Sequence, residues 1–115
     1  MINKSRVEIK DIKIGQGEEA VKGALCFIEY EGRLTDGTVF DSTQKHGRPF
    51  ELVLGSKKII QGMSQGIIGM RVGGFREIYI PSLLAYGERQ VGQFIKPHSD
   101  LIFKVELLEA RPREV

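Results

Sequence analysis

Apolar and polar residues alternate along most of this 115-residue chain, in segments that end at glycine or proline. A period of two is typical of β-strands with one buried and one solvent-facing side. The alternation predicts strands over 7–14, 25–34, 50–54, 75–80 and 101–108, with further extended backbone at Val39 and Phe40. Residues expected to share one face are Cys26, Ile28 and Tyr30 of the second strand and Leu101, Phe103, Val105 and Leu107 of the last. The chain is therefore expected to form an antiparallel sheet.

Turn-forming residues separate the predicted strands. Asp36-Gly37 supplies the positive φ that a tight reversal requires. The segments Asp41-Ser42-Thr43 and Gly47-Arg48-Pro49 predict an irregular loop before the next strand. Residues 83–97 form a long connection rich in glycine and polar residues, and such a loop inside a compact domain is more often functional than idle.

The hydrophobic period changes to three and four residues between positions 60 and 70, which predicts the one convincing helix of the chain. Its apolar face carries Ile60, Met63, Ile67 and Met70. It also contains Gly62, Gly66 and Gly69, and each glycine costs about 1 kcal/mol relative to alanine inside a helix. Packing must therefore hold this helix in place, and its small residues would let a sheet approach closely. Several strands around one helix indicate an α+β fold.

Length, charge and cysteine content limit the number of domains, the partners and the metal sites that the chain can have. The length fits one domain, with a core of about 7–109 and tails at 1–6 and 110–115. The net charge of +2 comes from scattered basic residues, so nucleic acid is not an expected partner. One cysteine and two histidines exclude an internal disulfide and predict no metal site. No segment resembles a signal peptide or a membrane span, so a cytoplasmic monomer is expected if the chain is complete.

A set of short runs, taken in order and spacing, resembles the FKBP-type (macrolide-binding) peptidyl-prolyl cis/trans isomerases in their minimal single-domain form. The runs are Tyr30-Glu31-Gly32, Asp36-Gly37-Thr38-Val39-Phe40-Asp41-Ser42, Pro49-Phe50, Leu54-Gly55, Ile59-Ile60-Gln61-Gly62, Ala85-Tyr86-Gly87, Ile95-Lys96-Pro97-His98 and Leu101-Ile102-Phe103-Lys104-Val105-Glu106-Leu107. The resemblance implies a twisted antiparallel half-barrel of about five strands wrapped around one short α-helix. A substrate pocket would lie between the sheet and the helix.

The resemblance also implies an activity, acceleration of cis/trans rotation about Xaa-Pro bonds in peptides and in flexible or unfolded proteins. Rotation breaks amide resonance against a barrier of about 18–20 kcal/mol, but no covalent bond is made or cut. The twisted amide is less polar than the planar one, so a dry apolar pocket favours it without metal, cofactor or nucleophile. Macrolides such as tacrolimus and rapamycin are expected ligands.

By resemblance, five residues are candidate catalytic groups and seven more are candidate binding groups. The first set is Tyr30, Phe40, Asp41, Tyr86 and Phe103, and the second is Phe50, Ile59, Ile60, Met63, Ala85, Val91 and Ile95. Aromatic edges would hold the proline ring and the twisted carbonyl. The N–H of Ile60 and the hydroxyl of Tyr86 would donate hydrogen bonds to the substrate, and Asp41 would accept one from Tyr30.

Other interpretations of these residues remain open. An inward-facing Tyr30 or Phe103, taken alone, is more often a core residue than a binding residue. An isolated Asp41-Ser42 pair more often caps a turn. His46 and His98 have no paired nucleophile in motif position and are expected to be surface or structural residues. Cys26 is expected to be a small buried hydrophobe.

Departures from the family pattern lie at the floor and rim of the expected pocket. Met63 stands where the family often has a large aromatic residue, Leu83-Leu84 adds apolar surface, and 88–94 is an unusually charged loop. Two other functions compete with the isomerase. One is a binding module that uses the same pocket with little turnover. The other is a small nucleic-acid-binding β domain, and the scattered charge argues against this interpretation.

Overall fold

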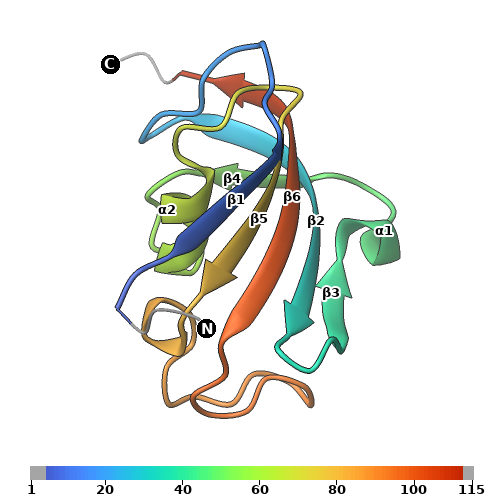
Figure 1. Ribbon diagram of the computed structural model, residues 1–115, viewed down its shortest axis with the longest axis vertical. Coiled ribbons are helices and arrows are strands. Elements are labelled where there is room, and N and C mark those ends of the chain that lie inside the picture. Colours follow the sequence, from blue (N-terminus) through green and yellow to red (C-terminus); the bar gives the residue numbers. More distant parts are fainter. Residues whose placement is uncertain (1–4, 113–115) are drawn as a thin grey trace.

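Six antiparallel strands form one open sheet in the computed structural model, which describes residues 5–112 (Figure 1). They are β1 (Glu8–Lys13), β2 (Leu25–Leu34), β3 (Val39–Ser42), β4 (Phe50–Val53), β5 (Phe75–Ile80) and β6 (Leu101–Arg111). The strand order is β1-β5-β6-β2-β3, and β4 also pairs with β2. The sheet curves across the main helix, α2 (Gln61–Ile67), as Figure 1 shows. The predicted α+β class is confirmed, with six strands in place of about five.

Strand β2 organises the sheet because it uses both of its edges. Along one edge it pairs with β6 from Leu25 to Leu34. Along the other edge it pairs first with β4 and then with β3. Side chains from four strands therefore meet around the second half of β2, where the functional site lies.

The segment expected to be an irregular loop is more regular, which corrects that prediction. Asp41 and Ser42 end β3, and Thr43–His46 forms a short helix, α1. The Ser42 hydroxyl accepts a hydrogen bond from the Lys45 N–H at 3.1 Å, and Gly47 ends the helix with a φ of 74°. Serine before a helix and glycine after it are the usual local start and stop signals, so the evidence for α1 was present in the sequence.

The long connection after β5 also contains regular structure. Ser82–Leu84 forms a 3₁₀ turn, η1, and Val91 pairs with Ile95 in an isolated β-bridge. Among residues 5–112 there is no helix long and apolar enough to cross a membrane.

Two glycines let helix α2 lie directly against β5. A Cβ atom at Gly62 would overlap Ile80, and one at Gly66 would overlap Ile78. Both isoleucines are fully buried. The expected close approach of a sheet is therefore confirmed, although the helix ends at Ile67 rather than near Met70, because Ile68 is already extended with a ψ of 129° and Gly69 follows with a φ of 93°.

A buried arginine ties the end of helix α2 to the edge strand β1. The guanidinium of Arg76 donates to Asp11 at 2.7 Å and to the carbonyl oxygens of Gly66 and Ile68 at 3.0 and 3.3 Å. These carbonyls have no partner within the helix, and a buried charge is tolerated only when such partners satisfy it. Arg76 thus holds α2 in position beneath the sheet.

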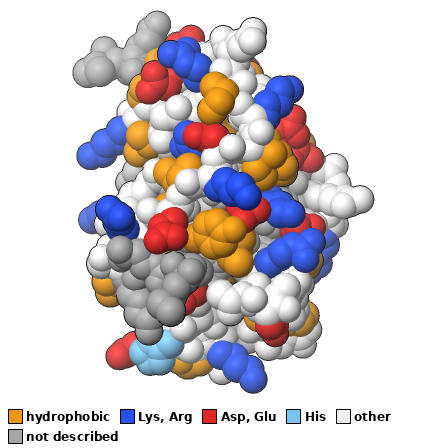
Figure 2. Space-filling model, viewed as in Figure 1, with side chains coloured by type: hydrophobic (Ala, Val, Ile, Leu, Met, Phe, Trp, Pro, Cys, Tyr) orange, Lys and Arg blue, Asp and Glu red, His pale blue; other side chains and the backbone are white. Residues whose placement is uncertain are grey.

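Charges of both signs cover the solvated side of the sheet. Lys10, Glu77, Lys104 and Glu31 are successive neighbours in register across β1, β5, β6 and β2. Opposite charges at directly opposed positions favour the observed register. Figure 2 shows basic and acidic side chains mixed over the visible surface rather than gathered by sign.

The single cysteine lies in the core. Cys26 is 0 % exposed, and burial raises the pKa of its thiol from 9.0 to about 11. We expect iodoacetamide at pH 8 to alkylate it at least ~100-fold more slowly in the native protein than in urea, because two pKa units remove about 99 % of the thiolate. Mass spectrometry of timed samples measures the two rates. Comparable rates would show that Cys26 is accessible.

Candidate active site

An aromatic cluster lies on the concave side of the sheet, next to helix α2. Its rings come from four strands: Tyr30 of β2, Phe40 of β3, Phe50 of β4 and Phe103 of β6. The Phe40 and Phe103 rings are 5.6 Å apart at 90°, and the Tyr30 and Phe50 rings are 5.7 Å apart at 77°. Tyr30 also lies 5.9 Å from Phe103. Edge-to-face contacts of this kind stabilise ring pairs and fix their orientation.

Gly32 makes room for two of these rings. It pairs with Phe103 on one side and with Asp41 on the other. A Cβ atom at Gly32 would lie 2.6 Å from Cζ of Phe40 and 2.9 Å from Cε1 of Phe103. Gly32 belongs to a family run that assigned it no role, although a glycine inside a strand often marks a close approach.

The aromatic cluster borders a cavity of about 380 Å³. Most predicted site residues line it: Tyr30, Phe40, Asp41, Phe50, Ile59, Ile60, Met63, Ala85, Tyr86 and Phe103. Lys57, Lys58, Gln61 and Arg89 also line it and were not among the predicted site residues. The Arg89 guanidinium lies 5.9 Å from the centre of the Tyr86 ring. With Asp41, these four residues give the aromatic and aliphatic lining a substantial polar part.

Two of the predicted binding residues are not part of this lining. Val91 and Ile95 pair with each other through N–H to carbonyl hydrogen bonds of 2.8 and 3.2 Å. Ile95 is buried in the core, and Val91 packs against it. Their backbone pairing shapes the long connection, and their contact with a ligand stays a prediction.

A carboxylate anchors one wall of the cavity. The hydroxyl of Tyr30 donates to Asp41 Oδ2 at 2.6 Å, as expected, and the N–H of Ser42 donates to Asp41 Oδ1 at 2.9 Å. One oxygen of Asp41 thus holds a cavity residue, and the other accepts from the N–H of Ser42, the residue that caps α1. Nε2 of His46 also lies 2.9 Å from Asp41 Oδ1. His46 is on the surface, as expected, but its contact with Asp41 was not foreseen, because only α1 turns it toward β3.

Hydrogen bonding sets the protonation states of this wall. Burial opposes ionisation of Asp41, but the hydrogen bonds from Tyr30, His46 and Ser42 outweigh it and lower its pKa below the usual value. Burial, and then the bond to Asp41, raise the pKa of Tyr30 far above its usual value. Burial also raises the pKa of Tyr86. At neutral pH the site therefore presents a carboxylate that holds the Tyr30 hydroxyl, and a protonated Tyr86 whose hydroxyl can donate to a ligand.

The side chains of the cavity differ in what they can offer a ligand. The walls are aromatic and aliphatic, and the polar groups serve to orient. Within residues 5–112, no group of three or more His, Cys, Asp and Glu side chains is placed to hold a metal ion. A twisted sheet over one main helix, with an aromatic cavity and an oriented phenol–carboxylate pair, defines a class of protein with a pre-formed binding pocket.

Comparison with known proteins identifies the family. The family model for FKBP-type peptidyl-prolyl cis-trans isomerases matches residues 16–108. An FK506-binding protein of Neisseria meningitidis serogroup A is 45 % identical over 101 residues, which cover 88 % of this chain and 93 % of that protein. FK506-binding protein 2 of Yarrowia lipolytica is 46 % identical over 91 residues, which cover 79 % of this chain and 63 % of that protein.

Solved structures agree with the sequence matches. The crystal structure of AtFKBP13 superposes with a TM-score of 0.83 at 38 % identity and covers 90 % of this chain and 91 % of its own. That of FkpA from Escherichia coli has the same TM-score of 0.83 at 33 % identity and covers 92 % of this chain and 48 % of its own. The chain belongs to the FKBP-type peptidyl-prolyl cis-trans isomerase family, and its enzyme class is the one expected from the sequence.

Proposed function

We propose that this protein accelerates rotation about Xaa-Pro bonds by binding the twisted amide noncovalently in the aromatic cavity. The observation that carries the proposal is the ring arrangement of Tyr30, Phe40 and Phe103 around a cavity of about 380 Å³. Loss of resonance makes the twisted amide less polar, so walls that exclude water stabilise it relative to the planar form. Each 1.36 kcal/mol of such stabilisation is about tenfold in rate.

Individual roles follow from position. Phe103 is only 4 % exposed and lies between Tyr30 and Phe40, so it would form the inner wall against the proline ring. Tyr86 is half-buried in the lining, and its protonated hydroxyl would donate to the substrate backbone. Ile60 precedes α2 and lines the cavity, so its N–H would be a second donor. Asp41 would act through Tyr30 by fixing the orientation of its ring.

Ligands follow from the same cavity. Proline-bearing segments of flexible or unfolded proteins are the proposed substrates, and macrolides such as tacrolimus and rapamycin are proposed inhibitors. The macrolide proposal is supported by the FK506-binding relatives and by the cavity-lining residues that belong to the family runs. Met63 is 6 % exposed at the floor and offers a flexible thioether, which fits a softer proline slot than an aromatic floor would give.

Replacement of the carboxylate tests the proposal. Asp41→Leu removes the acceptor that holds the Tyr30 hydroxyl at 2.6 Å. We expect kcat/KM for an Xaa-Leu-Pro-Phe peptide to fall about tenfold, equivalent to about 1.4 kcal/mol in the transition state, while the far-ultraviolet circular dichroism stays unchanged. A protease-coupled assay or NMR exchange spectroscopy measures the rate.

Asp36→Leu is the matched control, because Asp36 lies in the β2–β3 turn and does not line the cavity. It should retain wild-type kcat/KM. If the unmodified protein gave no acceleration of the peptide, the enzyme proposal would be wrong. Equal activities of Asp41→Leu and the wild type would instead remove Asp41 from the mechanism.

A further inference from the structure

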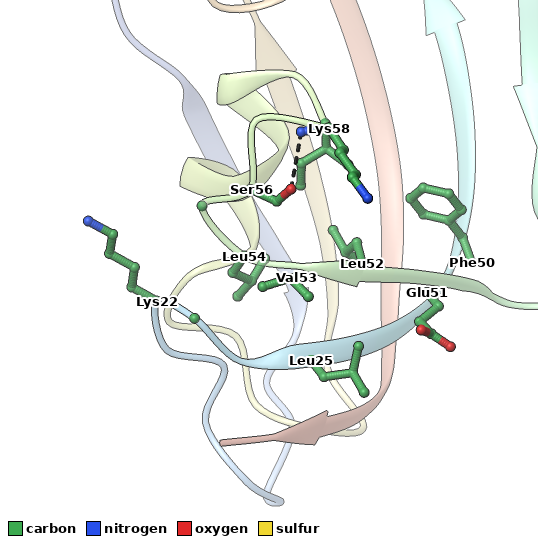
Figure 3. Close-up of a pocket in the computed structure, with 12 residues that line it drawn as sticks. Lys22, Leu25, Phe50, Glu51, Leu52, Val53, Leu54, Ser56 and Lys58 are labelled. Carbon is green, nitrogen blue, oxygen red and sulfur yellow. Dashed lines mark hydrogen bonds between the residues drawn. The ribbon is translucent and has the colours of Figure 1, made fainter. Parts of the chain in front are cut away.

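A second cavity, larger than the aromatic one, lies beside strand β4 (Figure 3). Its volume is about 780 Å³, and its lining includes side chains from both faces of β4. Leu52 and Phe50 project to one side of the strand, whereas Glu51 projects to the other (Figure 3). The cavity is therefore a groove that follows the edge of β4; we call it the β4 groove.

The backbone of β4 leaves one edge available along this groove. Among the described residues, β4 pairs only with β2, from Phe50 opposite Ile28 to Val53 opposite Leu25. Peptide groups of an antiparallel strand point alternately to its two edges. Those of Glu51 and Val53 point away from β2 toward the groove, and apart from the Val53 carbonyl oxygen, which accepts from Ser56, they are a template for a further strand.

The opposite wall of the groove is a well-anchored loop. The N–H of Gly55 donates to the buried Ser64 hydroxyl at 2.9 Å, which ties the loop to helix α2. The N–H of Ser56 donates to the Val53 carbonyl at 3.1 Å, and the N–H of Lys58 donates to the Ser56 hydroxyl at 3.1 Å (Figure 3). A wall held by three hydrogen bonds lowers the ordering cost of binding.

Positive charge prevails around the β4 groove. Lys22 and Lys58 line it together with one acidic residue, Glu51. Lys57 joins Lys22 in an adjoining hollow that has no acidic lining residue. An occupant with acidic side chains complements this rim, and complementary charge favours both encounter and register.

The β4 groove is continuous with the aromatic cavity. Phe50, Lys58 and Ile59 line both spaces. A chain segment whose proline occupies the aromatic cavity can therefore continue past Phe50 and run along β4.

We propose that the β4 groove binds the residues flanking the proline of an extended client segment, as an added strand against β4, and prefers acidic residues there. The proposal rests on the proposed function, because the aromatic cavity must first accept the proline. Backbone pairing would supply sequence-tolerant affinity, and Leu25 and Val53 would contact alternate apolar side chains of the client.

Peptide length and charge test this proposal. The KM of a proline tetrapeptide is compared with the KM of twelve-residue peptides that contain the same tetrapeptide. The added residues lie on one side or the other of the tetrapeptide. They alternate apolar residues either with acidic residues or with lysine. For one of the two placements, we expect the acidic peptide to have a KM at least about fivefold lower than that of the tetrapeptide. The lysine peptide with the same placement should show less than half of this decrease in KM. N-methylation of alternate flanking amides should abolish the gain.

Lys22→Glu tests the groove in the protein without altering the aromatic cavity, which Lys22 does not line. It should remove the gain of the acidic peptide and leave the tetrapeptide rate unchanged. Lys13→Glu, on β1 at the far edge of the sheet and opposite the uncharged Phe75, is the matched control and should keep the gain. NMR amide shifts of Glu51 and Val53 should respond to the long peptide only.

The readouts separate this proposal from the proposed function. An inactive tetrapeptide assay contradicts the isomerase, whereas normal tetrapeptide turnover with no gain for any long peptide contradicts the groove proposal. A gain that survives Lys22→Glu and N-methylation also contradicts it. Concentration-dependent self-association of the free protein that Lys22→Glu abolishes would assign the groove to a second copy of the chain instead.

Discussion

Gly32→Ala is expected to lower kcat/KM for a proline peptide about 10- to 100-fold while the domain stays folded. The new Cβ atom would lie 2.6 Å from the Phe40 ring and 2.9 Å from the Phe103 ring, so both rings must move. Misplacement of a reacting group by about 1 Å can cost about 100-fold in rate. A protease-coupled assay measures the loss, and altered ring-current shifts in the NMR spectrum of Phe40 and Phe103 would show its cause.

A second glycine separates cavity damage from general destabilisation. Gly37 lies in the β2–β3 turn with a φ of 93° and nothing within 4 Å of an added Cβ atom. Gly37→Ala strains the turn but leaves the rings in place, so it should cost stability and retain activity. Full activity of Gly32→Ala with unchanged aromatic shifts would show that the cavity tolerates the displacement.

Gly66→Ala is expected to lower the free energy of unfolding by about 2–3 kcal/mol, although alanine favours an isolated helix by about 1 kcal/mol. The added methyl group would overlap Cγ2 of Ile78 and lie 2.8 Å from its Cδ1. Ile78 is fully buried, and the Arg76 hydrogen bond to the Gly66 carbonyl resists movement of the helix. Urea denaturation followed by circular dichroism measures the change.

Gln65→Ala is the matched control for this prediction. Gln65 neighbours Gly66 on the same helix but is exposed, so its replacement should change stability by less than about 0.5 kcal/mol. In a double-mutant cycle, Ile78→Ala should reduce the added cost of Gly66→Ala, because it removes the atoms that overlap. Additive effects, or a Gly66→Ala protein as stable as the wild type, would contradict close packing between α2 and β5.

Local patterns located most of the regular elements. The strands at 25–34 and 75–80 have the predicted limits, because alternation and the flanking turn residues are properties of neighbouring positions. The last strand continues past 108 to Arg111, which pairs with Leu25 of β2. Its end depends on a partner distant in sequence, so alternation alone could not place it. Helix α1 was missed although its cap residues are local, because four residues are too short to show a helical period.

The walls of the candidate site were predicted, but some of its contacts were not. Its aromatic walls were assigned by resemblance, and the structure brings Tyr30, Phe40, Tyr86 and Phe103 to one cavity. The resemblance did not indicate the contact between His46 and Asp41. It also gave no reason for Gly32, whose role appears only when Phe40 and Phe103 are seen to meet above it.

The sequence by itself determined the class of fold, the family and the chemical character of the walls, because these depend on residue type, period and order. Tertiary structure alone decided which residues touch. Strand β2 receives β6 on one edge and both β3 and β4 on the other, and this pairing brings distant segments together around Tyr30 and Gly32. It also leaves one edge of β4 beside a second groove. Pairing of strands is nonlocal, and a one-residue change of register would turn every side chain of a strand to the other face.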